Sequence, residues 1–176
     1  MKKVCIIFLL SIIISLTALG FSGVTESGAS VNESYLRIHI RADSNAESAQ
    51  AVKYRVRDEI VAYLTPLVAE YETREEAISG VETRLKTIEA VANGVLEAHG
   101  FAYGANARLT REVFPTRVYE GYTLPAGEYA ALVIELGAGK GDNWWCVVYP
   151  PLCFTSGNGN IVYKSKILEI IKNAAK

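Results

Sequence analysis

Positive charge is not in excess in this sequence, and histidine, cysteine and tryptophan are scarce. The 176 residues include 18 Lys and Arg against 19 Asp and Glu, with only two histidines, three cysteines and two tryptophans. A balanced charge excludes the basic surface with which proteins bind nucleic acid. Apolar residues make up 50% of the chain, which is enough for the core of one domain. The composition therefore predicts a single folded domain that binds no nucleic acid.

The short motifs of common enzyme families are also missing. The sequence contains no GxSxG, no HExxH and no closely spaced carboxylate pair in a glycine-bounded loop. The loop GAGKGDN (137–143) is glycine-rich, but a strand-like segment follows it, whereas a phosphate-binding loop opens a helix. We therefore interpret it as a hairpin loop. His39 and His99 could join Cys146 and Cys153 in a Cys2His2 site, but their spacing resembles no zinc site. We expect neither a metal nor a cofactor.

The N-terminus has the layout of an export signal. Two lysines precede a run without any charged residue, Val4–Phe21, and this run is long enough to cross a bilayer. Residues 1–21 are predicted to be a signal peptide or a retained membrane anchor, and both alternatives stay open. Residues 22–34, rich in Ser and Gly, are predicted to be a linker, and residues 35–176 a single exported domain. Any membrane contact would be made only through the N-terminal segment, if it is not cleaved.

Export determines how the cysteines are interpreted. Cys5 lies within the N-terminal apolar run, so the exported part contains only Cys146 and Cys153. An even pair of cysteines in an oxidising compartment favours a disulfide, and Pro150 and Pro151 between them let the chain turn back. The alternative is two reduced cysteines that are buried as small apolar residues.

The hydrophobic pattern predicts a strand followed by two helices. Residues 35–42, YLRIHIRA, alternate strictly between apolar and polar side chains, which is typical of a half-buried strand. A first helix is expected to start at a capping box formed by Ser44 and Glu47 and to end or bend near Thr65, because Pro66 follows. The charged residues of this helix fall largely on the faces away from its apolar stripe; they are Lys53, Arg55, Arg57, Asp58 and Glu59. A second helix is expected from a capping box at Thr73 and Glu76 to a C-terminal Gly100.

Three further strands and a tail helix complete the prediction. Alternating or apolar runs mark strands at 105–113, 128–136 and 144–149, and the segment 165–174 has the pattern of a short amphipathic helix. The order β-α-α-β-β-β-α predicts an α+β fold in which helices pack on one face of a mostly antiparallel sheet.

Both tryptophans fall in one segment, GKGDNWWCVVYPPLCF (139–154). On a strand, Trp144 and Trp145 point to opposite faces, so either both are covered by protein or one is an exposed anchor for a partner. The two prolines cannot donate to a strand ladder, so this end of the strand is an edge or an exit. A rigid aromatic edge loses little entropy on docking. The predicted partner-binding residues are Asn143, Trp144, Trp145, Tyr149, Pro150, Pro151, Phe154, Phe114 and Tyr119.

Two other functions stay open. Cys146 could be the nucleophile of a thiol or cell-wall hydrolase, with His39 as its base and Asp43 or Asp142 as the group that orients it. Cys146 lies within a strand, however, whereas catalytic cysteines often lie at helix N-termini. His39 lies on the polar side of its strand, where a solvated histidine is the common case. In the other alternative, the tryptophans bind lipid or peptidoglycan.

Several segments resemble one known family. NWWCVVYPPLCF (143–154), preceded by FPTRVYEGYTLPAGEYAALVIELG (114–137), resembles stage II sporulation protein R of endospore-forming bacteria. The early segment LRIHIRADSNAESAQAVKYRVRD (36–58) and the tail SKILEIIK resemble the same family, so that the likeness covers about residues 35 to 170.

The resemblance implies a signalling protein rather than an enzyme. Members of the family are made in the forespore and exported into the space between the forespore and mother-cell membranes. There they activate the membrane-embedded sigma-E processing peptidase, which resembles an aspartic protease, so that pro-sigma-E is cleaved in the mother cell. The resemblance does not indicate which residues contact the peptidase.

Overall fold

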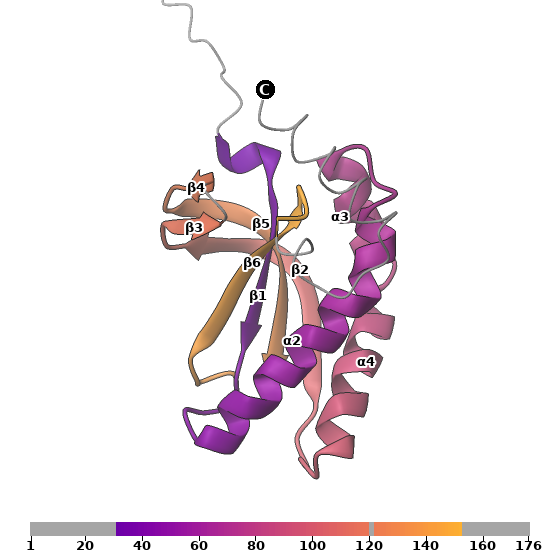
Figure 1. The fold of residues 1–176 in the computed structure, drawn as a ribbon, viewed down its shortest axis with the longest axis vertical. Coiled ribbons are helices and arrows are strands. Elements are labelled where there is room, and N and C mark those ends of the chain that lie inside the picture. The colour runs from indigo at the N-terminus through magenta and orange to yellow at the C-terminus, as the bar shows by residue number, and fades with distance from the viewer. Residues whose placement is uncertain (1–30, 120–121, 153–176) are drawn as a thin grey trace, which may run out of the picture. The chain divides into compact units, whose positions relative to one another are not determined.

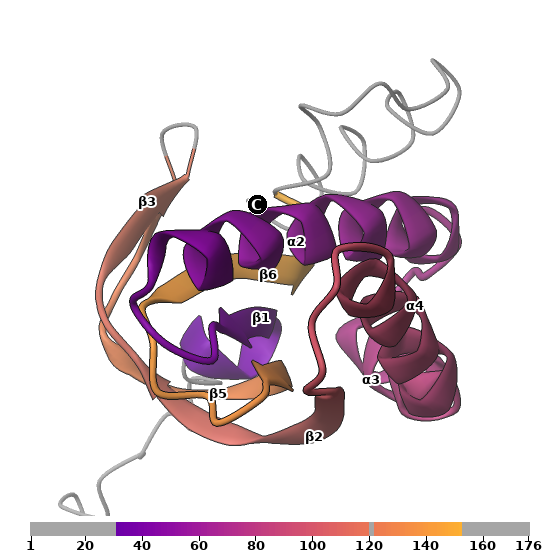
Figure 2. The same ribbon diagram turned by 90° about the horizontal axis from the view of Figure 1, so that it is seen from below.

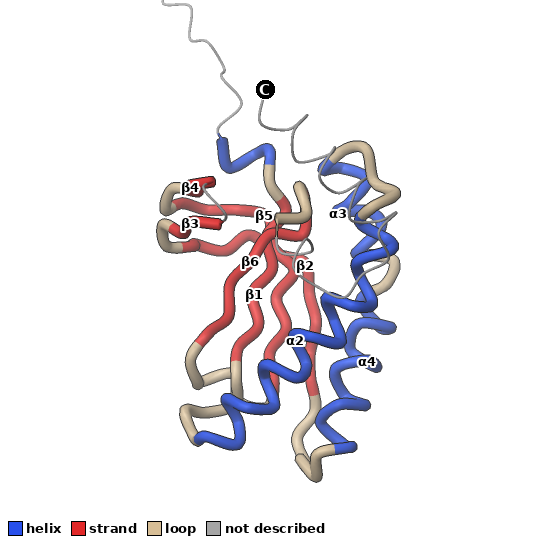
Figure 3. Tube along the Cα trace, viewed as in Figure 1, coloured by secondary structure: helices blue, strands red, loops and turns tan. Residues whose placement is uncertain are grey.

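A mixed four-stranded sheet, three helices and a small hairpin make up the computed structural model, which describes residues 31–119 and 122–152. The chain divides into two units, Met1–Ser30 and Val31–Lys176, and the first lies outside the described residues. The elements, traced in Figures 1 and 3, are a 3-10 helix η1 (Val31–Ser34), β1 (Leu36–Arg41), α2 (Glu47–Val68), α3 (Arg74–Glu82), α4 (Leu85–Ala98), β2 (Ala105–Phe114), β3 (Arg117–Tyr119), β4 (Tyr122–Leu124), β5 (Gly127–Leu136) and β6 (Asn143–Tyr149).

The strand order in the sheet is β2-β5-β1-β6, and β3 and β4 form a separate two-stranded sheet. β1 runs parallel to β5 and antiparallel to β6, while β2 runs antiparallel to β5. Seen from below, α3 and α4 lie on one side of the sheet and the β3–β4 hairpin on the other (Figure 2). These pairings confirm the predicted α+β class and the mostly antiparallel sheet.

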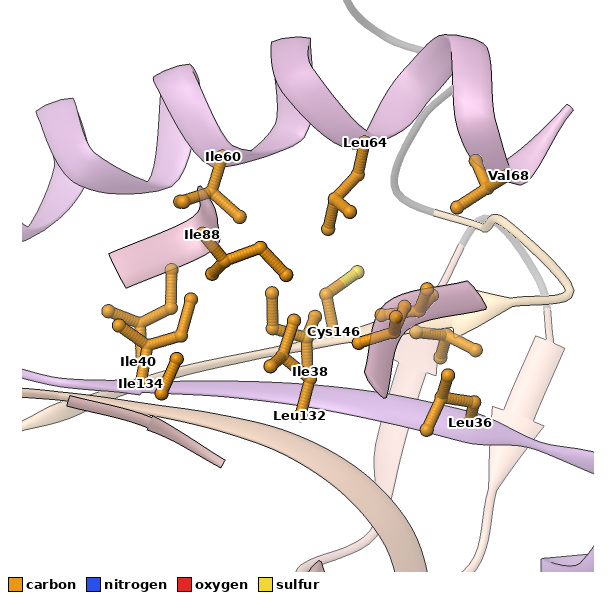
Figure 4. Packing of buried hydrophobic residues seen from close by; sticks show 14 of the residues in the cluster. Leu36, Ile38, Ile40, Ile60, Leu64, Val68, Ile88, Leu132, Ile134 and Cys146 are labelled. Carbon is orange, nitrogen blue, oxygen red and sulfur yellow. The ribbon is translucent and has the colours of Figure 1, made fainter. Parts of the chain in front are cut away.

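The main core lies between the sheet and the helices. Leu36, Ile38 and Ile40 of β1 are fully buried, as their alternation predicts, and they face Ile60 and Leu64 of α2 (Figure 4). Each such side chain contributes about 1.5–3 kcal/mol when it is removed from water. β1 lies between β5 and β6 in the sheet, and its apolar face meets α2 and α3.

The structure confirms the predicted N-cap at Thr73, although Glu76 accepts from the backbone N–H of Glu72 rather than from that of Thr73, and it contradicts the other predicted capping box. Thr73 is the N-cap of α3 and accepts a hydrogen bond from the backbone N–H of Glu76 at 3.2 Å. The predicted box at Ser44 and Glu47 is wrong, because Ala46 is the N-cap of α2 and makes no side-chain capping bond. The carbonyl of Ser44 instead accepts a hydrogen bond from the side chain of Gln50, so this residue helps to close the loop.

The helix boundaries also differ from the prediction. α2 continues through Pro66 to Val68. The proline lies in the last turn, where only one backbone bond is lost, and Thr65 adds a bond there from its hydroxyl to the carbonyl of Val61 (2.6 Å).

The second predicted helix is two helices, α3 and α4, separated at Thr83 and Arg84. Both side chains donate to the carbonyl of Gly80, at 3.0 and 2.9 Å. These bonds satisfy a carbonyl at the end of α3, and glycine and threonine are weak helix formers, so the chain stops and restarts here. Gly100 follows the end of α4 with φ +76°, as the predicted C-terminal glycine requires.

The glycine-rich segment that joins β5 to β6 is not a hairpin loop. The two strands lie on opposite sides of β1, so the loop crosses over the end of that strand. The backbone N–H groups of Lys140 and Gly141 donate to the carbonyls of Asp43 and Ala42, at 3.1 and 2.9 Å. The hairpin prediction is therefore wrong, because β1 inserts between two strands that are neighbours in sequence.

Two predictions concern residues that the structure does not describe. They are the tail helix at 165–174 and the N-terminal apolar run. Within the described ranges, none of the helices combines the length and the apolar character that a membrane crossing demands.

Candidate partner-binding site

The candidate site is the face of the sheet that points away from the helices. We call it the outer face, and it comprises Arg37, His39, Arg41, Arg108, Glu112, Phe114, Tyr129, Ala131, Val133, Glu135 and Trp145. Arg37 and His39 alternate with the apolar residues of β1, so they point away from the main core. The prediction of a half-buried strand with a solvated histidine is nevertheless wrong. Arg37 is 0% and His39 1% exposed, because aromatic side chains and the β3–β4 hairpin cover this side as well.

Aromatic rings form a second, small core on the outer face. Phe114 and Tyr129 are fully buried and meet edge to face, with ring centroids 5.8 Å apart. The His39 ring stacks on Trp145 at 3.7 Å, and Phe114 meets the same indole edge-on at 4.8 Å. Such contacts stabilise a fold beyond the area that they bury. They hold Trp145 in one orientation at the start of β6.

A chain of ion pairs crosses three strands beside these rings. His39 Nδ1 lies 2.7 Å from Glu112 Oε2, and Arg41 bonds the other oxygen of the same carboxylate. Arg41 also pairs with Glu135 at 2.7 Å, and Arg108 pairs with Glu135 at 2.5 Å. The hydrogen bond from Arg108 lowers the pKa of Glu135. Burial lowers the pKa of His39, although the bond to Glu112 opposes this shift.

Arg37 has a different environment from these paired arginines. Its guanidinium carbon lies 4.1 Å from the ring centroid of Phe114 and 4.9 Å from that of Tyr129. Its Nη2 donates to the hydroxyl of Tyr119 at 2.7 Å. Its Nε and Nη1 are buried and have no acceptor in the part of the chain that the structure describes. Phe114 and Tyr119, both predicted to bind a partner, thus surround a cation.

The structure divides the predicted partner-binding residues between the two faces. Trp145 and Tyr119 are half-buried on the outer face, and Asn143 is exposed at the start of β6. Trp144 is half-buried and packs on the helix side. Phe114 is 0% exposed, so its side chain offers no surface to a partner.

The other predicted residues lie near the end of β6. Tyr149 is buried, and its hydroxyl donates to the carbonyl of Glu72 at 2.5 Å. Pro150 and Pro151 are buried as well. Phe154 lies outside the described residues. The surface near Asn143 and Trp145 is therefore the accessible part of the predicted site.

A pocket of about 450 Å³ opens at this accessible part. It is lined by Gln50, Lys53, Tyr54, Arg117, Asp142, Asn143 and Trp145. The sequence places Lys53 on a polar face of its helix, but its side chain is only 1% exposed. The amine donates to Gln50 Oε1 at 2.6 Å and to the carbonyl of Asp142 at 2.9 Å. This burial was missed because the acceptor that permits it is 89 residues away in sequence.

The geometry does not support a thiol nucleophile at Cys146 with His39 as its base. Cys146 pairs with Ile38 in the sheet, belongs to the main core, and points toward α2 (Figure 4). His39 points to the outer face, so the sheet separates the two side chains. The predicted bridge from Cys146 to Cys153 involves a residue outside the described ranges and stays a prediction. Across residues 31–119 and 122–152 there is also no group of three metal-ligating side chains.

Comparison with known proteins identifies the family. The family described as stage II sporulation protein R matches residues 32–158, a range that includes every described strand and helix from β1 to β6. The chain belongs to the stage II sporulation protein R family. Stage II sporulation protein R of Bacillus subtilis (strain 168) is 36% identical to the chain over 138 residues. That alignment covers 78% of this chain and 62% of the relative, so the chain spans less than two thirds of the relative's length. No solved structure matches the chain.

Proposed function

We propose that this protein is an exported signal of sporulation that activates the membrane-embedded sigma-E processing peptidase. In this proposal it is made in the forespore and reaches the space between the two membranes. There it binds the peptidase, and pro-sigma-E is cleaved in the mother cell. The observation that carries the proposal is the family match, which covers the sheet, the helices and the outer face together.

The architecture supports binding rather than catalysis. The thiol and the imidazole that a hydrolase would need lie on opposite faces of the sheet. On the outer face, His39 is stacked on Trp145 and bonded to Glu112, so its ring is held in place by neighbours. A fixed aromatic group at an accessible edge suits a docking surface, because little side-chain entropy is lost on binding.

Activation by a binding partner has a simple thermodynamic form. A ligand that binds the active state of the peptidase more tightly than the inactive state shifts the population toward the active one. No bond in the signalling protein has to form or break. The signal is then the presence of the protein on the outer side of the mother-cell membrane.

The test is co-expression in a bacterium that is not sporulating. The full-length chain, the peptidase and pro-sigma-E are produced together, and the cleaved fraction of pro-sigma-E is followed by immunoblot. We expect cleavage only when all three proteins are present. Cleavage that is equally extensive without this chain would contradict the proposal. The double variant Cys146→Ser with His39→Gln adds a second comparison, because a hydrolase would lose its activity whereas a ligand that still folds would retain cleavage.

A further inference from the structure

Arg37 is a buried cation for which the described residues supply no counter-charge. Arg41, Arg108 and Arg111 each pair with carboxylates, but Arg37 pairs with none among the described residues. A guanidinium carries five N–H donors, and among the described residues the acceptors beside Arg37 are neutral tyrosine hydroxyls, with Tyr119 at 2.7 Å. Burying a charge without an opposite charge is unfavourable, so this position needs an explanation.

The aromatic rings around Arg37 stabilise its positive charge but do not neutralise it. The guanidinium lies over Phe114 and Tyr129 and within 5.7 Å of the Tyr119 ring centroid. Aromatic faces attract cations, which explains how Arg37 tolerates its position. They carry no negative charge, and the Tyr119 hydroxyl accepts only from Nη2. Among the described residues, Nε and Nη1 of Arg37 have no acceptor.

A second arginine without a carboxylate partner lies on the hairpin that covers Arg37. Arg117 is exposed in β3, two residues before Tyr119, and no ion pair involves it among the described residues. Burial is the largest cause that lowers the pKa of Arg37, and the positive charge of Arg117 lowers it further. The repulsion between two such positive charges is reduced when an anion binds beside them.

Arg117 lines the pocket described above. Lys53, Asn143 and Trp145 line it as well. Lys53 is bonded to an amide oxygen and a backbone carbonyl rather than to a carboxylate. Asp142 also lines the pocket and attracts Lys53, so one negative side chain lies in the lining with the positive side chains of Lys53 and Arg117. The pocket remains net positive.

We infer that the pocket lined by Arg117 is a binding site for an acidic side chain of a protein partner. The carboxylate enters the pocket beside Trp145 and pairs with the accessible Arg117. Arg37 is buried outside the lining, and its positive charge lies close to the same strand as Arg117, because its Nη2 bonds Tyr119 of β3. Trp145 is fixed by His39 and Phe114 and provides an apolar wall for the methylene groups of the same side chain. The inference rests on the proposed function for the identity of the partner, because it assigns this site to contact with the peptidase.

Binding of a defined acidic peptide tests the site directly. The full-length chain, kept in detergent, is titrated into fluorescein-labelled hexaglutamate, and fluorescence anisotropy is recorded. Arg117→Gln is expected to weaken binding about tenfold, as loss of a hydrogen bond to a charged group does. Arg117→Lys keeps the charge but loses the planar fork, so its affinity is expected to be intermediate. Arg55→Gln is the matched control, because Arg55 is exposed on α2 away from this pocket, and its affinity should equal that of the unaltered chain.

Several results would overturn the inference. Equal losses for Arg117→Gln and Arg55→Gln would show only a general charge effect. Equal binding of labelled hexaglutamine would show that the carboxylates are not recognised. Inorganic phosphate that competes as well as unlabelled hexaglutamate, compared at equal concentration, would indicate a simple anion site rather than a site for a protein segment.

The co-expression assay separates this inference from the proposed function. If the unaltered chain does not promote cleavage of pro-sigma-E, the proposed function fails, whatever the peptide titrations show. If the unaltered chain promotes cleavage and Arg117→Gln does so equally, the function stands and the site is not the contact with the peptidase. Reduced cleavage for Arg117→Gln, with normal cleavage for Arg55→Gln, supports both.

Discussion

His39 is packed against an indole on one side and bonded to a carboxylate at its edge. Burial lowers its pKa, so the folded protein binds a proton at this ring less readily than the unfolded chain does. Stability from this group is therefore fully present above the pKa of an ordinary histidine and declines as the pH falls through that value. The carboxylate of Glu112 opposes the shift, and the charge of Arg41 adds to it.

The first prediction follows from the lowered pKa of His39. The free energy of unfolding should decrease when the pH is lowered from about 7.5 to about 5.5, across the ordinary histidine pKa. His39→Gln should reduce this dependence, whereas His99→Gln, at the exposed end of α4, should retain it. Urea titrations followed by circular dichroism give the required values. Parallel pH profiles for all three proteins would contradict the assignment to His39.

The helix-side core gives a second prediction at the residue scale. Ile38→Ala removes a fully buried side chain between Leu132 and Cys146, and it should cost about 2–5 kcal/mol of stability. Val113→Ala on β2 is the matched control, because Val113 is 74% exposed, and its cost should stay within about 0.5 kcal/mol. Thermal and urea unfolding measure both, and similar losses for the two variants would mean that β1 is not the centre of the core.

The burial of a single side chain could be predicted only where it depends on residues nearby in the sequence. The alternation in β1 indicates which side chains of this strand share a face, and the structure confirms it for Leu36, Ile38 and Ile40. It does not indicate that the polar face is also covered, because the cover comes from residues far along the chain. Nor could it show that Arg37 pairs with no carboxylate of residues 31–119 and 122–152, since that depends on residues far along the chain.

At the scale of elements, the loop between β5 and β6 is the most constrained connection. It passes over the end of β1, and a Cβ on Gly141 would collide with the carbonyl oxygen of Ser44. The chain therefore needs glycine here for space rather than for an unusual φ. Gly94 in α4 is the opposite case, because a Cβ there would meet nothing within 4 Å.

The third prediction uses this pair of glycines. Gly141→Ala should destabilise the protein by about 1–3 kcal/mol, as overpacking does. Gly94→Ala should stabilise it by about 0.5–1 kcal/mol, because alanine is the better helix former in an open position. Both variants add one methyl group, so a thermal melt distinguishes the two environments. Equal effects would show that the loop does not press against the segment between β1 and α2.

The elements themselves were predicted with mixed success, for physical reasons. The strands at 105–113 and 128–136 and the cap at Thr73 depend on nearby residues and are confirmed within a residue or so. The break at Thr83 depends on side-chain bonds to one carbonyl, which no periodic pattern reveals. The short strands of the β3–β4 hairpin were not predicted, although this hairpin covers Arg37 and supplies Tyr119 and Arg117 to the candidate site.

At the scale of the whole molecule, the cysteine pair provides the fourth prediction. If Cys146 and Cys153 form the predicted bridge, intact protein recovered from an oxidising compartment should not react with iodoacetamide at either residue until it is reduced. Intact-mass spectrometry before and after reduction makes this measurement under denaturing conditions. Two alkyl groups added without reductant would contradict the bridge and favour two reduced cysteines. Cys146→Ser should leave Cys153 reactive, which is the control.

The position of β1 in the sheet governs the order in which the fold can be completed. Of the strands that the structure describes it is synthesised first, yet Leu36 pairs with Ala130 on one side and with Tyr149 on the other. Closing such long loops is slow, because bringing the two ends of the intervening chain together costs entropy before either ladder forms. Both edges of β1 therefore wait for β5 and β6 to emerge. A nascent or translocating chain cut short before β6 would carry an open, apolar edge, which is the state that chaperones and proteases recognise.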